Sequence, residues 1–335
     1  DRLSMVNKIG YETYKDLRTI SPDDLETLID DMITKGLGVL IARGQSLTPI
    51  EMELVCSKLA RYFNGQQEYA MWPGQSKAIG KHTSMLGNYR AEKDKQFGLV
   101  DCVIGEQLGE FKPALNEIEE FHSDGSFLEL PKSAIALYAP NYTEKIICPA
   151  EGAETRFASC KRASECLTDE ERANLRKLTA VHSWETFMRL LERRDPERTK
   201  VTEEMISKKP DQIFPVLRKL THRDGAYESI YVNPKNTKRL YSSDTSSEIV
   251  EFALGKELIR FNNKTGENSQ DAVEKIAKFI LDCTPDNTYA HKWKPGDFVL
   301  FDNRSLIHAA SPFDANKYQR LLFRSEFKGE KVIPA

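Results

Sequence analysis

Apolar residues recur at helical spacing in four stretches of the chain, each marked by a helix-start signal or an apolar stripe. Three stretches open with the Ser/Thr-x-x-Glu/Asp pattern that caps a helix N-terminus. In the fourth, Val273, Ile276, Ile280 and Leu281 fall on one helical face. We therefore predict helices over residues 21–35, 48–63, 168–178 and 269–282.

Short runs rich in β-branched and aromatic residues lie between these helices and are typical of strands. We predict strands over residues 38–42, 134–139, 229–232, 297–302 and 321–327. Residues 66–98 follow neither period and are rich in Gly, Gln and Lys, so we expect either a lid over a binding site or a surface loop there.

The composition of the 335-residue chain is that of a soluble globular protein, with 40% apolar and 30% charged residues. Its formal net charge of −3 argues against a general nucleic-acid binder, because such proteins carry a strong basic excess. No stretch approaches about eighteen apolar residues, so we expect no membrane span. The glycine-rich nucleotide-binding motifs and the G-x-S-x-G motif of α/β-hydrolases are absent from the sequence.

The six cysteines are scattered and form no C-x-x-C pair, which argues against zinc ribbons and thioredoxin-like chemistry. In a chain of this length such spacing suggests a reducing compartment, with the thiols buried as small apolar groups. The first residues lack the apolar core of a signal peptide. We therefore expect a cytoplasmic protein, although the absence of an initial Met leaves room for a targeting segment that has been removed.

One short segment, FHSDGSFLELP at residues 121–131, contains candidate metal ligands. His122 and Asp124 are separated by one residue, so in a β-strand their side chains would point to the same face. Such a pair can bind one metal ion, or it can be an ordinary surface pair. Among the six histidines, His308 is the best third ligand, because a Pro-Gly-Asp turn, an apolar strand and an Asp-Asn-Arg turn precede it and would place it inside a sheet.

Two arginines follow His308 in the segment YQRLLFRSEF and suggest an anionic ligand. In a strand, Arg320 and Arg324 would share one face with residue 322. A buried arginine without a partner is costly, whereas a guanidinium pairs bidentately with a carboxylate. We therefore expect these two side chains to line a surface that binds carboxylates.

Together these motifs resemble the taurine dioxygenase-like family of iron(II)- and 2-oxoglutarate-dependent oxygenases, within the clavaminate synthase-like superfamily. The H-x-D motif of that family corresponds to His122 and Asp124, and its distal histidine to His308. The resemblance implies that these three residues bind iron and that Arg320 binds the distal carboxylate of 2-oxoglutarate. It also implies an α+β chain with a mostly β core, the double-stranded β-helix or jelly roll, with flanking α-helices.

The resemblance extends over roughly residues 20–335. It implies a single iron(II)/2-oxoglutarate dioxygenase domain over residues 1–335, in which residues 66–98 and 185–268 are lid or insert segments.

Further positions acquire expected roles only through this resemblance. The stretch EGAETRFAS places a threonine that contacts the cosubstrate at Thr155. The second family arginine, which often holds the acidic group of the primary substrate, corresponds to Arg324, whose alternative role is a structural ion pair with Glu326 or with an acid in a loop. Trp184 in AVHSW and Asn236 match positions near the substrate pocket, and Tyr69 in YAMWP is either a pocket-facing lid residue or an apolar anchor.

Two histidines and one carboxylate leave three coordination positions of an iron ion open. The resemblance implies that 2-oxoglutarate fills two of them and dioxygen the third, that succinate and CO2 are released, and that ascorbate stimulates the reaction. Halogenases of the wider superfamily replace the carboxylate with a small residue, so Asp124 favours hydroxylation or another C–H oxidation. Desaturation and oxidative ring closure of an amino-acid-derived, kainoid-like compound remain alternatives.

The expected partner is a small acidic molecule such as an amino acid, a sulfonate or a natural-product intermediate. Neither nucleic acid nor membrane is expected, and a homo-oligomer remains open. Two other functional classes remain alternatives to an oxygenase. One is a non-catalytic β-helix protein that binds a small anion or senses metal, and the other is a zinc or manganese hydrolase or isomerase. Arg320 argues against the second, because hydrolysis has no need of a clamp for a dicarboxylate.

Overall fold

The computed structural model describes residues 8–67, 81–87, 118–141, 152–194, 200–222, 225–313 and 320–335. Within these ranges the helices are α1 (Pro22–Thr34), α2 (Pro49–Ala60), α3 (Cys160–Glu165), α4 (Asp169–Arg176), α5 (Trp184–Arg194), α6 (Glu203–Ser207), α7 (Ser269–Asp282) and the 3-10 helix η2 (Ile118–Glu120). The four helices predicted from the apolar pattern correspond to α1, α2, α4 and α7, and are confirmed.

Side-chain caps explain where the predicted helices begin. Thr48 and Glu51 form a reciprocal capping box at the start of α2, and Thr168 and Glu171 form another at α4. A serine hydroxyl caps α1 in the same way, although without the reciprocal glutamate. In α7, three of the four residues of the predicted apolar stripe are buried.

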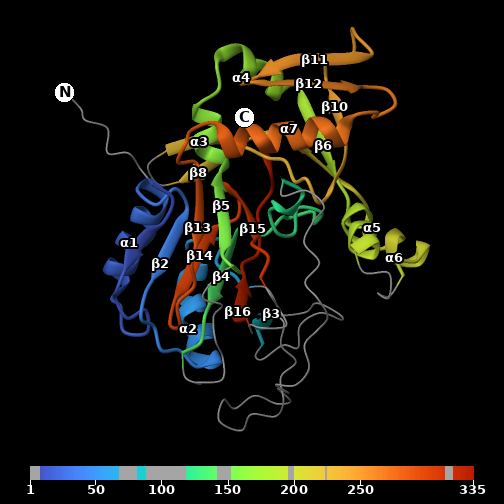
Figure 1. Cartoon of the computed structure of the whole chain (residues 1–335). Helices are drawn as coiled ribbons and strands as arrows, with labels where there is room; N and C mark the ends of the chain where they lie inside the picture. Colours follow the sequence, from blue (N-terminus) through green and yellow to red (C-terminus); the bar gives the residue numbers. More distant parts are fainter. Residues whose placement is uncertain are drawn as a thin grey trace, which may run out of the picture.

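The largest sheet has six strands in the order β1-β2-β14-β4-β16-β3 (Figure 1). Its strands are β1 (Tyr11–Thr13), β2 (Val39–Ala42), β14 (Phe298–Asp302), β4 (Ala134–Tyr138), β16 (Leu321–Glu326) and β3 (Thr83–Gly87). β1 runs parallel to β2, and all other neighbours are antiparallel. Four of the five predicted strands, namely β2, β4, β14 and β16, lie in this sheet and are confirmed.

The two faces of this sheet are buried in different cores because its side chains alternate between them. Leu40 and Leu300 point to one face, where they pack with apolar residues of α1 and α2. Val39, Ile41 and Leu137 point to the opposite face and belong to a second core cluster. Figure 1 shows α1 and α2 on the outer side of the sheet. The second core therefore lies between the six-stranded sheet and a smaller one.

The smaller sheet has the order β13-β5-β15 and carries one of the candidate ligands. Its strands are β13 (Thr288–His291), β5 (Thr155–Ser159) and β15 (Leu306–Ala310). Phe157 of β5 and Leu306 of β15 enter the core cluster that they share with the six-stranded sheet. The phenyl rings of Phe157 and Phe301 meet edge to face, with centroids 5.1 Å apart. The strand that holds His308 thus belongs to the smaller of two sheets that share a core.

Three further groups of strands extend the structure beyond these two sheets. They are β10 (Thr237–Ser242), β6 (Leu178–His182) and β7 (Gln212–Pro215); β17 (Ile333–Pro334), β8 (Leu217–His222) and β9 (Gly225–Ile230); and the hairpin β11 (Ile249–Leu254) with β12 (Glu257–Asn262). Helix α7 packs against β10 and β12, and Figure 1 shows it running beneath the hairpin. Its apolar face completes a separate hydrophobic core.

The fifth predicted strand is only partly right. Residues 229–232 were predicted as a strand, but β9 ends at Ile230. Beyond it the chain enters a turn in which the carbonyl of Asn233 accepts hydrogen bonds from the backbone N–H groups of Asn236 and Thr237. Residues 231 and 232 are buried, and the backbone N–H of Tyr231 still donates to the Val216 carbonyl at 2.6 Å, one residue beyond the last pair of β8 and β9.

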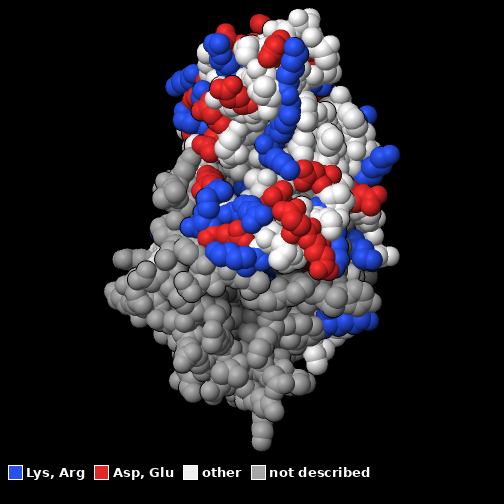
Figure 2. Space-filling model, turned by 90° about the vertical axis from the view of Figure 1, so that its right-hand side faces the viewer, with Lys and Arg blue, Asp and Glu red and all other residues white. Residues whose placement is uncertain are grey.

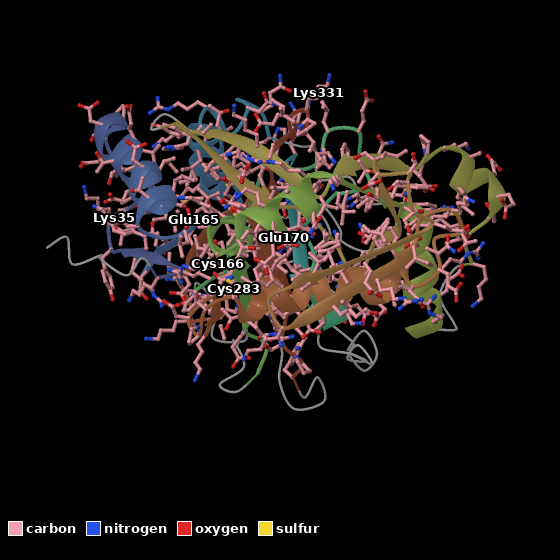
Figure 3. The ribbon with its side chains drawn as sticks, turned by 90° about the horizontal axis from the view of Figure 1, so that it is seen from above. Lys35, Glu165, Cys166, Glu170, Cys283 and Lys331 are labelled. Atoms are coloured by element: carbon pink, nitrogen blue, oxygen red, sulfur yellow. The ribbon has the colours of Figure 1, made fainter. Side chains whose placement is uncertain are left out.

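The prediction that the cysteines are buried holds for Cys56 and Cys160 but is wrong for Cys166, which is exposed. Cys283 is half-buried. Cys166 follows α3 and Cys283 follows α7, so the packing of these helices brings the two thiols near each other (Figure 3). Burial and the neighbouring Cys166 raise the pKa of the Cys283 thiol to about 12.

On the part of Figure 2 that is not grey, acidic and basic side chains lie next to each other in small groups. Many of the charges are paired across short distances, as in the contacts of Lys238 with Glu185 at 3.6 Å and with Asp211 at 3.1 Å. Within the described ranges, no helix is both long and apolar enough to cross a bilayer.

Candidate metal centre

His122 and His308 lie directly opposite each other although they are far apart in the sequence. The backbone N–H of His122 donates to the His308 carbonyl at 2.9 Å, and the reverse bond is 2.8 Å long. β15 in turn pairs with β5, with His308 opposite Phe157. This short antiparallel bridge holds both imidazoles on the same part of the small sheet, and their ring centroids are 4.3 Å apart.

The expectation that His122 and Asp124 share the face of a strand is wrong. His122 makes a single β-bridge, and Asp124 already belongs to a turn. The turn needs Gly125, whose φ is +66° and whose absent side chain leaves room for Lys132, 2.8 Å from the position a Cβ would take. The two ligands therefore meet because the chain turns back, not because of strand periodicity.

The side-chain amide of Asn303 holds the Asp124 turn in place. Its oxygen accepts from the backbone N–H of Asp124 at 2.8 Å, and its NH2 group donates to the Asp124 carbonyl and to the Lys132 carbonyl, both at 2.9 Å. Asn303 follows β14 in the Asp-Asn-Arg turn that precedes β15. The same turn thus fixes His308 and Asp124 relative to each other.

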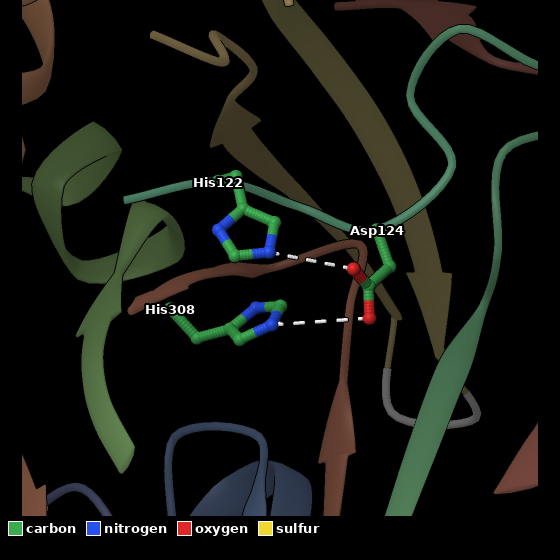
Figure 4. Close-up of side chains that lie close together, drawn as sticks. All are labelled: His122, Asp124 and His308. Carbon is green, nitrogen blue, oxygen red and sulfur yellow. Dashed lines mark ion pairs between the residues drawn. The ribbon is translucent and has the colours of Figure 1, made fainter. Parts of the chain in front are cut away.

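The three candidate ligands converge (Figure 4). Nε2 of His122 lies 3.4 Å from Oδ1 of Asp124, and Nε2 of His308 lies 3.8 Å from Oδ2. The ligand atoms of the three side chains all lie within 4.8 Å of one another. Two ligands about 2.1 Å from one ion and at right angles are about 3.0 Å apart. Small side-chain movements would therefore bring all three onto a single divalent ion.

Metal binding requires neutral imidazoles and an ionised carboxylate, and the surroundings of His308 and Asp124 favour these forms. Nδ1 of His122 lies 2.8 Å from the Glu120 carbonyl, so an N–H there leaves Nε2 as the free ligand atom. Burial lowers the pKa of His308 to about 3. Burial alone would raise the pKa of Asp124, but its contacts with His122, His308 and Arg324 hold it well below its usual range.

Three charged side chains follow one another beside Asp124. Nη1 of Arg324 lies 4.0 Å from Oδ2 of Asp124, and its Nη2 lies 3.2 Å from Oε1 of Glu326. Glu326 also accepts from Nζ of Lys132 at 2.6 Å. The sequence predicted Arg324 either as a residue for an anionic ligand or as the ion-pair partner of Glu326, and the structure contains that ion pair. Nothing in the sequence indicated Lys132 as the second partner of Glu326.

Arg320 lies one residue before β16 and is buried. Its Nε donates to the Ala153 carbonyl at 3.2 Å, and its Nη2 lies 3.4 Å from the hydroxyl of Thr155. The structure therefore brings together the arginine and the threonine that the resemblance links to the cosubstrate. The same hydroxyl accepts from the indole N–H of Trp293 at 3.0 Å.

Trp293 was not predicted from the sequence as part of this group. It reaches Thr155 because β13 pairs with β5, where His291 stands opposite Thr155. Nothing in the residues around Trp293 signals a partner so distant in the chain. Its indole also meets the ring of His291 edge to face, with centroids 4.6 Å apart.

Of the three remaining residues predicted for the substrate pocket, two contact residues near the Asp124 turn and one lies outside the described part of the chain. Trp184 is buried in an apolar cluster with Phe127, which follows the Asp124 turn. Nδ2 of Asn236 donates to the hydroxyl of Ser126 at 3.1 Å, within that turn. Asn233, which the sequence did not single out, also donates to the Ser126 hydroxyl at 2.8 Å. Tyr69 lies outside the described residues.

A family model described as "Taurine catabolism dioxygenase TauD, TfdA family" matches residues 4–325. Among curated proteins, (S)-phenoxypropionate/alpha-ketoglutarate-dioxygenase from Sphingobium herbicidovorans is 23% identical over 212 residues, which cover 63% of this chain and 62% of that protein. Pentalenolactone F synthase from Streptomyces avermitilis is 28% identical over 181 residues, covering 52% of this chain and 51% of the synthase. The chain thus matches between half and two thirds of the length of these two relatives.

Two solved structures are similar over nearly the whole chain. A taurine dioxygenase from Burkholderia xenovorans superposes with a TM-score of 0.63 at 17% sequence identity, covering 98% of this chain and 90% of that one. AAD-2, crystallised with Mn(II) and N-oxalylglycine, superposes with a TM-score of 0.64 at 18% identity, covering 97% and 95%. The fold of the chain is therefore the fold of these two proteins.

Proposed function

Because the chain belongs to the taurine catabolism dioxygenase TauD, TfdA family, we propose that it is an iron(II)- and 2-oxoglutarate-dependent oxygenase that oxidises a C–H bond of a small acidic molecule. Enzymes of this family use iron(II), 2-oxoglutarate and dioxygen. The observation that carries the proposal is the convergence of His122, Asp124 and His308, whose ligand atoms lie within 4.8 Å of one another.

In this proposal the triad holds the iron through two imidazoles and one carboxylate, a donor set that fits iron(II) and leaves three positions open. Bound iron, with 2-oxoglutarate and dioxygen, supplies the oxidative chemistry, and succinate and CO2 are released. The chain contributes the placement of the ligands. Glu120 orients His122, Asn303 holds Asp124, and the backbone bridge aligns both histidines.

We assign the distal carboxylate of 2-oxoglutarate to Arg320 and Thr155. A guanidinium and a hydroxyl within 3.4 Å of each other, both buried, offer a charge and a hydrogen bond to one carboxylate. Trp293 orients the Thr155 hydroxyl through its indole N–H. Cosubstrate binding does not need to order the Arg320 side chain, because contacts with Ala153 and Thr155 already hold it in place.

For the substrate we propose only a chemical class and the residues that line its pocket. Arg324 is suited to an acidic group, because its guanidinium lies beside the metal carboxylate. Trp184, Asn236 and Tyr69 are proposed to line the rest of the substrate pocket. An amino acid, a sulfonate or a natural-product intermediate fits these groups, and the outcome includes hydroxylation, desaturation and oxidative ring closure.

We further propose that the fold is a double-stranded β-helix in one domain. The support is the pair of facing sheets that share a core around Leu137 and Phe157 and that carry the triad at one part of the smaller sheet. The proposal includes residues 66–98 and 185–268 as lid or insert segments, of which residues 68–80, 88–98, 195–199 and 223–224 lie outside the described part of the chain. A cytoplasmic location, supported by the scattered cysteines, and a homo-oligomeric state complete the proposal.

The test is formation of succinate from 2-oxoglutarate by the purified chain with iron(II), ascorbate and a panel of small carboxylic and sulfonic acids. We expect succinate to form with at least one acid and to require iron and oxygen. Asp124→Ala is the inactive control, and Glu330→Gln, which removes an exposed partner of Arg304, is the matched acidic control. Absence of succinate from an iron-loaded protein across the panel would contradict the proposal, and turnover without oxygen would favour a hydrolase or isomerase.

A further inference from the structure

Four charged side chains form a continuous chain that ends at the proposed metal carboxylate. Lys132 Nζ lies 2.6 Å from Oε2 of Glu326. Arg324 Nη2 lies 3.2 Å from Oε1 of Glu326, and its Nη1 lies 4.0 Å from Oδ2 of Asp124. We call Lys132, Glu326, Arg324 and Asp124 the charge chain. Both oxygens of Glu326 are used, one by each cation.

The fold fixes the order of the charge chain. Arg324 and Glu326 are alternate residues of β16, so their side chains leave the same face of the strand. Lys132 stands just before β4, the neighbour of β16, and its backbone carbonyl accepts from the Asn303 amide that also holds Asp124. Two separate links, one through charges and one through Asn303, therefore join Lys132 to the Asp124 turn.

The charges depend on one another because they are withdrawn from water. The side chains of Lys132 and Glu326 are 10% and 11% exposed, and those of Arg324 and Asp124 are 17% and 18% exposed. Unpaired charges at such burial are costly. The four formal charges sum to zero, and Glu326 alone separates the two cations. Nε of Arg324 has no hydrogen-bond partner among the described residues, so Glu326 and Asp124 are the groups that orient its guanidinium.

We propose that Glu326 is a positioning residue of the metal centre. Lying between the two cations, it directs the guanidinium of Arg324 toward Oδ2 of Asp124 and offsets the positive charge that would otherwise oppose a divalent cation. The inference rests on the proposed metal site but assigns roles to Glu326 and Lys132 that the site itself does not require. It predicts that the two members of one ion pair affect metal affinity in different directions.

The test is the dissociation constant of Mn(II), measured by titration without cosubstrate or substrate. Glu326→Gln leaves two cations facing only Asp124, so we expect binding weakened by about 10- to 100-fold, as for other residues that support metal ligands. Lys132→Gln removes the outer cation and leaves Glu326 on Arg324, so we expect binding that is unchanged or tighter. If the ion pair of Lys132 and Glu326 served only to stabilise the fold, Glu326→Gln and Lys132→Gln would weaken Mn(II) binding to the same extent.

Three further variants test whether the charge of Glu326 is responsible for the change in Mn(II) binding. Glu326→Asp retains the negative charge and should bind Mn(II) more tightly than Glu326→Gln. The double variant Lys132→Gln/Glu326→Gln restores the charge balance and should recover part of the loss. Glu330→Gln, which lies four residues away and removes an exposed acid, should bind as the unmodified chain does. Thermal melting of each variant reports whether it is folded.

Equal binding by Glu326→Gln and the unmodified chain would overturn the inference, as would a loss in Lys132→Gln as large as that in Glu326→Gln. If Glu326→Gln does not fold, Glu326→Asp and Lys132→Gln decide: a tenfold loss in Lys132→Gln overturns the inference, and retained binding supports it. A failure of the unmodified chain to bind Mn(II) would instead remove the proposed metal centre, which distinguishes the two failures.

Discussion

Each proposed metal ligand is held by a different neighbour, and these neighbours decide how well the site is formed. The Glu120 carbonyl fixes the ring of His122, and a backbone bridge fixes His308. Asp124 depends most on a single side chain, because Asn303 bonds both its N–H and its carbonyl. These hydrogen bonds fix the positions of the three proposed ligands before any metal binds.

Asn303→Ala should therefore damage the site more than its distance from the metal suggests. The change removes three hydrogen bonds and leaves buried backbone groups unsatisfied, so we expect a loss of about 1–3 kcal/mol in the free energy of unfolding. Mn(II) binding should weaken by about tenfold or more. Chemical denaturation and metal titration measure the two effects.

Asn262→Ala is the matched control for this experiment. Asn262 also holds a turn, since its side-chain oxygen accepts from the backbone N–H groups of Lys264 and Thr265 at 2.8 Å. That turn follows β12, in a different sheet from the triad. Loss of stability with unchanged Mn(II) binding is expected here, and equal metal binding in both variants would refute the role given to Asn303.

Arg320→Ala and Asp124→Ala should fail in different ways. Loss of Asp124 should abolish metal binding, whereas loss of Arg320 should leave the metal bound and weaken 2-oxoglutarate binding by about 2–5 kcal/mol if the charge pair is buried. Titration of 2-oxoglutarate into the Mn(II)-loaded protein measures the second effect. Equal and negligible effects of the two changes would contradict both assignments.

The local sequence was enough to find the residues proposed to bind metal and cosubstrate, but not the residues that hold them in place. His122, Asp124, His308 and Arg320 are visible through spacing and residue type. Trp293, Asn303 and Lys132 act on partners across a sheet or a long stretch of chain. A tryptophan or an asparagine in a short loop carries no local mark of such a partner.

At the scale of single elements, the helices are defined by local signals. The capping box of α4 joins Thr168 to Glu171, and the same carboxylate accepts from the backbone N–H of Gly255 in the β11–β12 turn at 2.6 Å. One glutamate thus closes a helix end and anchors a hairpin. Removal of the cap should therefore be felt in both elements.

Thr168→Ala should lower the free energy of unfolding by about 1 kcal/mol, the usual cost of losing an N-cap side chain. Thr48→Ala tests the same capping box at α2 and should cost a similar amount. Denaturant unfolding of both variants gives the values. A loss below the experimental error in both would show that the capping boxes do not stabilise these helices.

Strands were predicted less completely than helices, for reasons visible in particular elements. β2, β4 and β14 are buried along their whole lengths and stand out as continuous apolar runs. β12 alternates instead, with Ile259 and Phe261 buried between exposed or half-buried neighbours, and that period of two could have been recognised. The Asp124 turn also has a local signal, the Asp124-Gly125 pair, but its attachment to Asn303 in a distant loop could not be recognised.

At the scale of the whole molecule, buried histidines link stability to pH. His182 is fully buried between Tyr231 and Phe214, with ring centroids 4.9 Å and 5.6 Å away. Neither of its ring nitrogens has a hydrogen-bond partner among the described residues. Burial lowers the pKa of His182 to about 3 and also lowers that of His291.

The sign of the pH effect follows from proton uptake. Below pH about 6.5 the unfolded chain binds a proton on His182 that the folded chain excludes, so the free energy of unfolding falls as the pH falls. At about 1.4 kcal/mol per pH unit, His182 alone lowers stability by about 2 kcal/mol between pH 7 and pH 5. Depressed carboxylate pKa values, such as that of Asp124, act in the same direction but only below about pH 4.

His182→Phe should remove this part of the pH dependence. Phenylalanine keeps the aromatic contacts and leaves no polar partner unsatisfied, so stability at pH 7 should change by less than about 1.5 kcal/mol. Denaturant unfolding at pH 7 and pH 5 should then show a difference about 2 kcal/mol smaller than in the unmodified chain. An unchanged pH dependence would show that His182 does not titrate on unfolding.

The most direct test of the account is the visible absorption of the protein after anaerobic addition of iron(II) and 2-oxoglutarate. If His122, Asp124 and His308 hold one iron ion that the cosubstrate chelates, a metal-to-ligand charge-transfer band should develop and saturate at one iron per chain. Asp124→Ala should show no band. A chain that is folded and binds iron yet gives no band with 2-oxoglutarate, or a band that survives Asp124→Ala unchanged, would contradict the central claim.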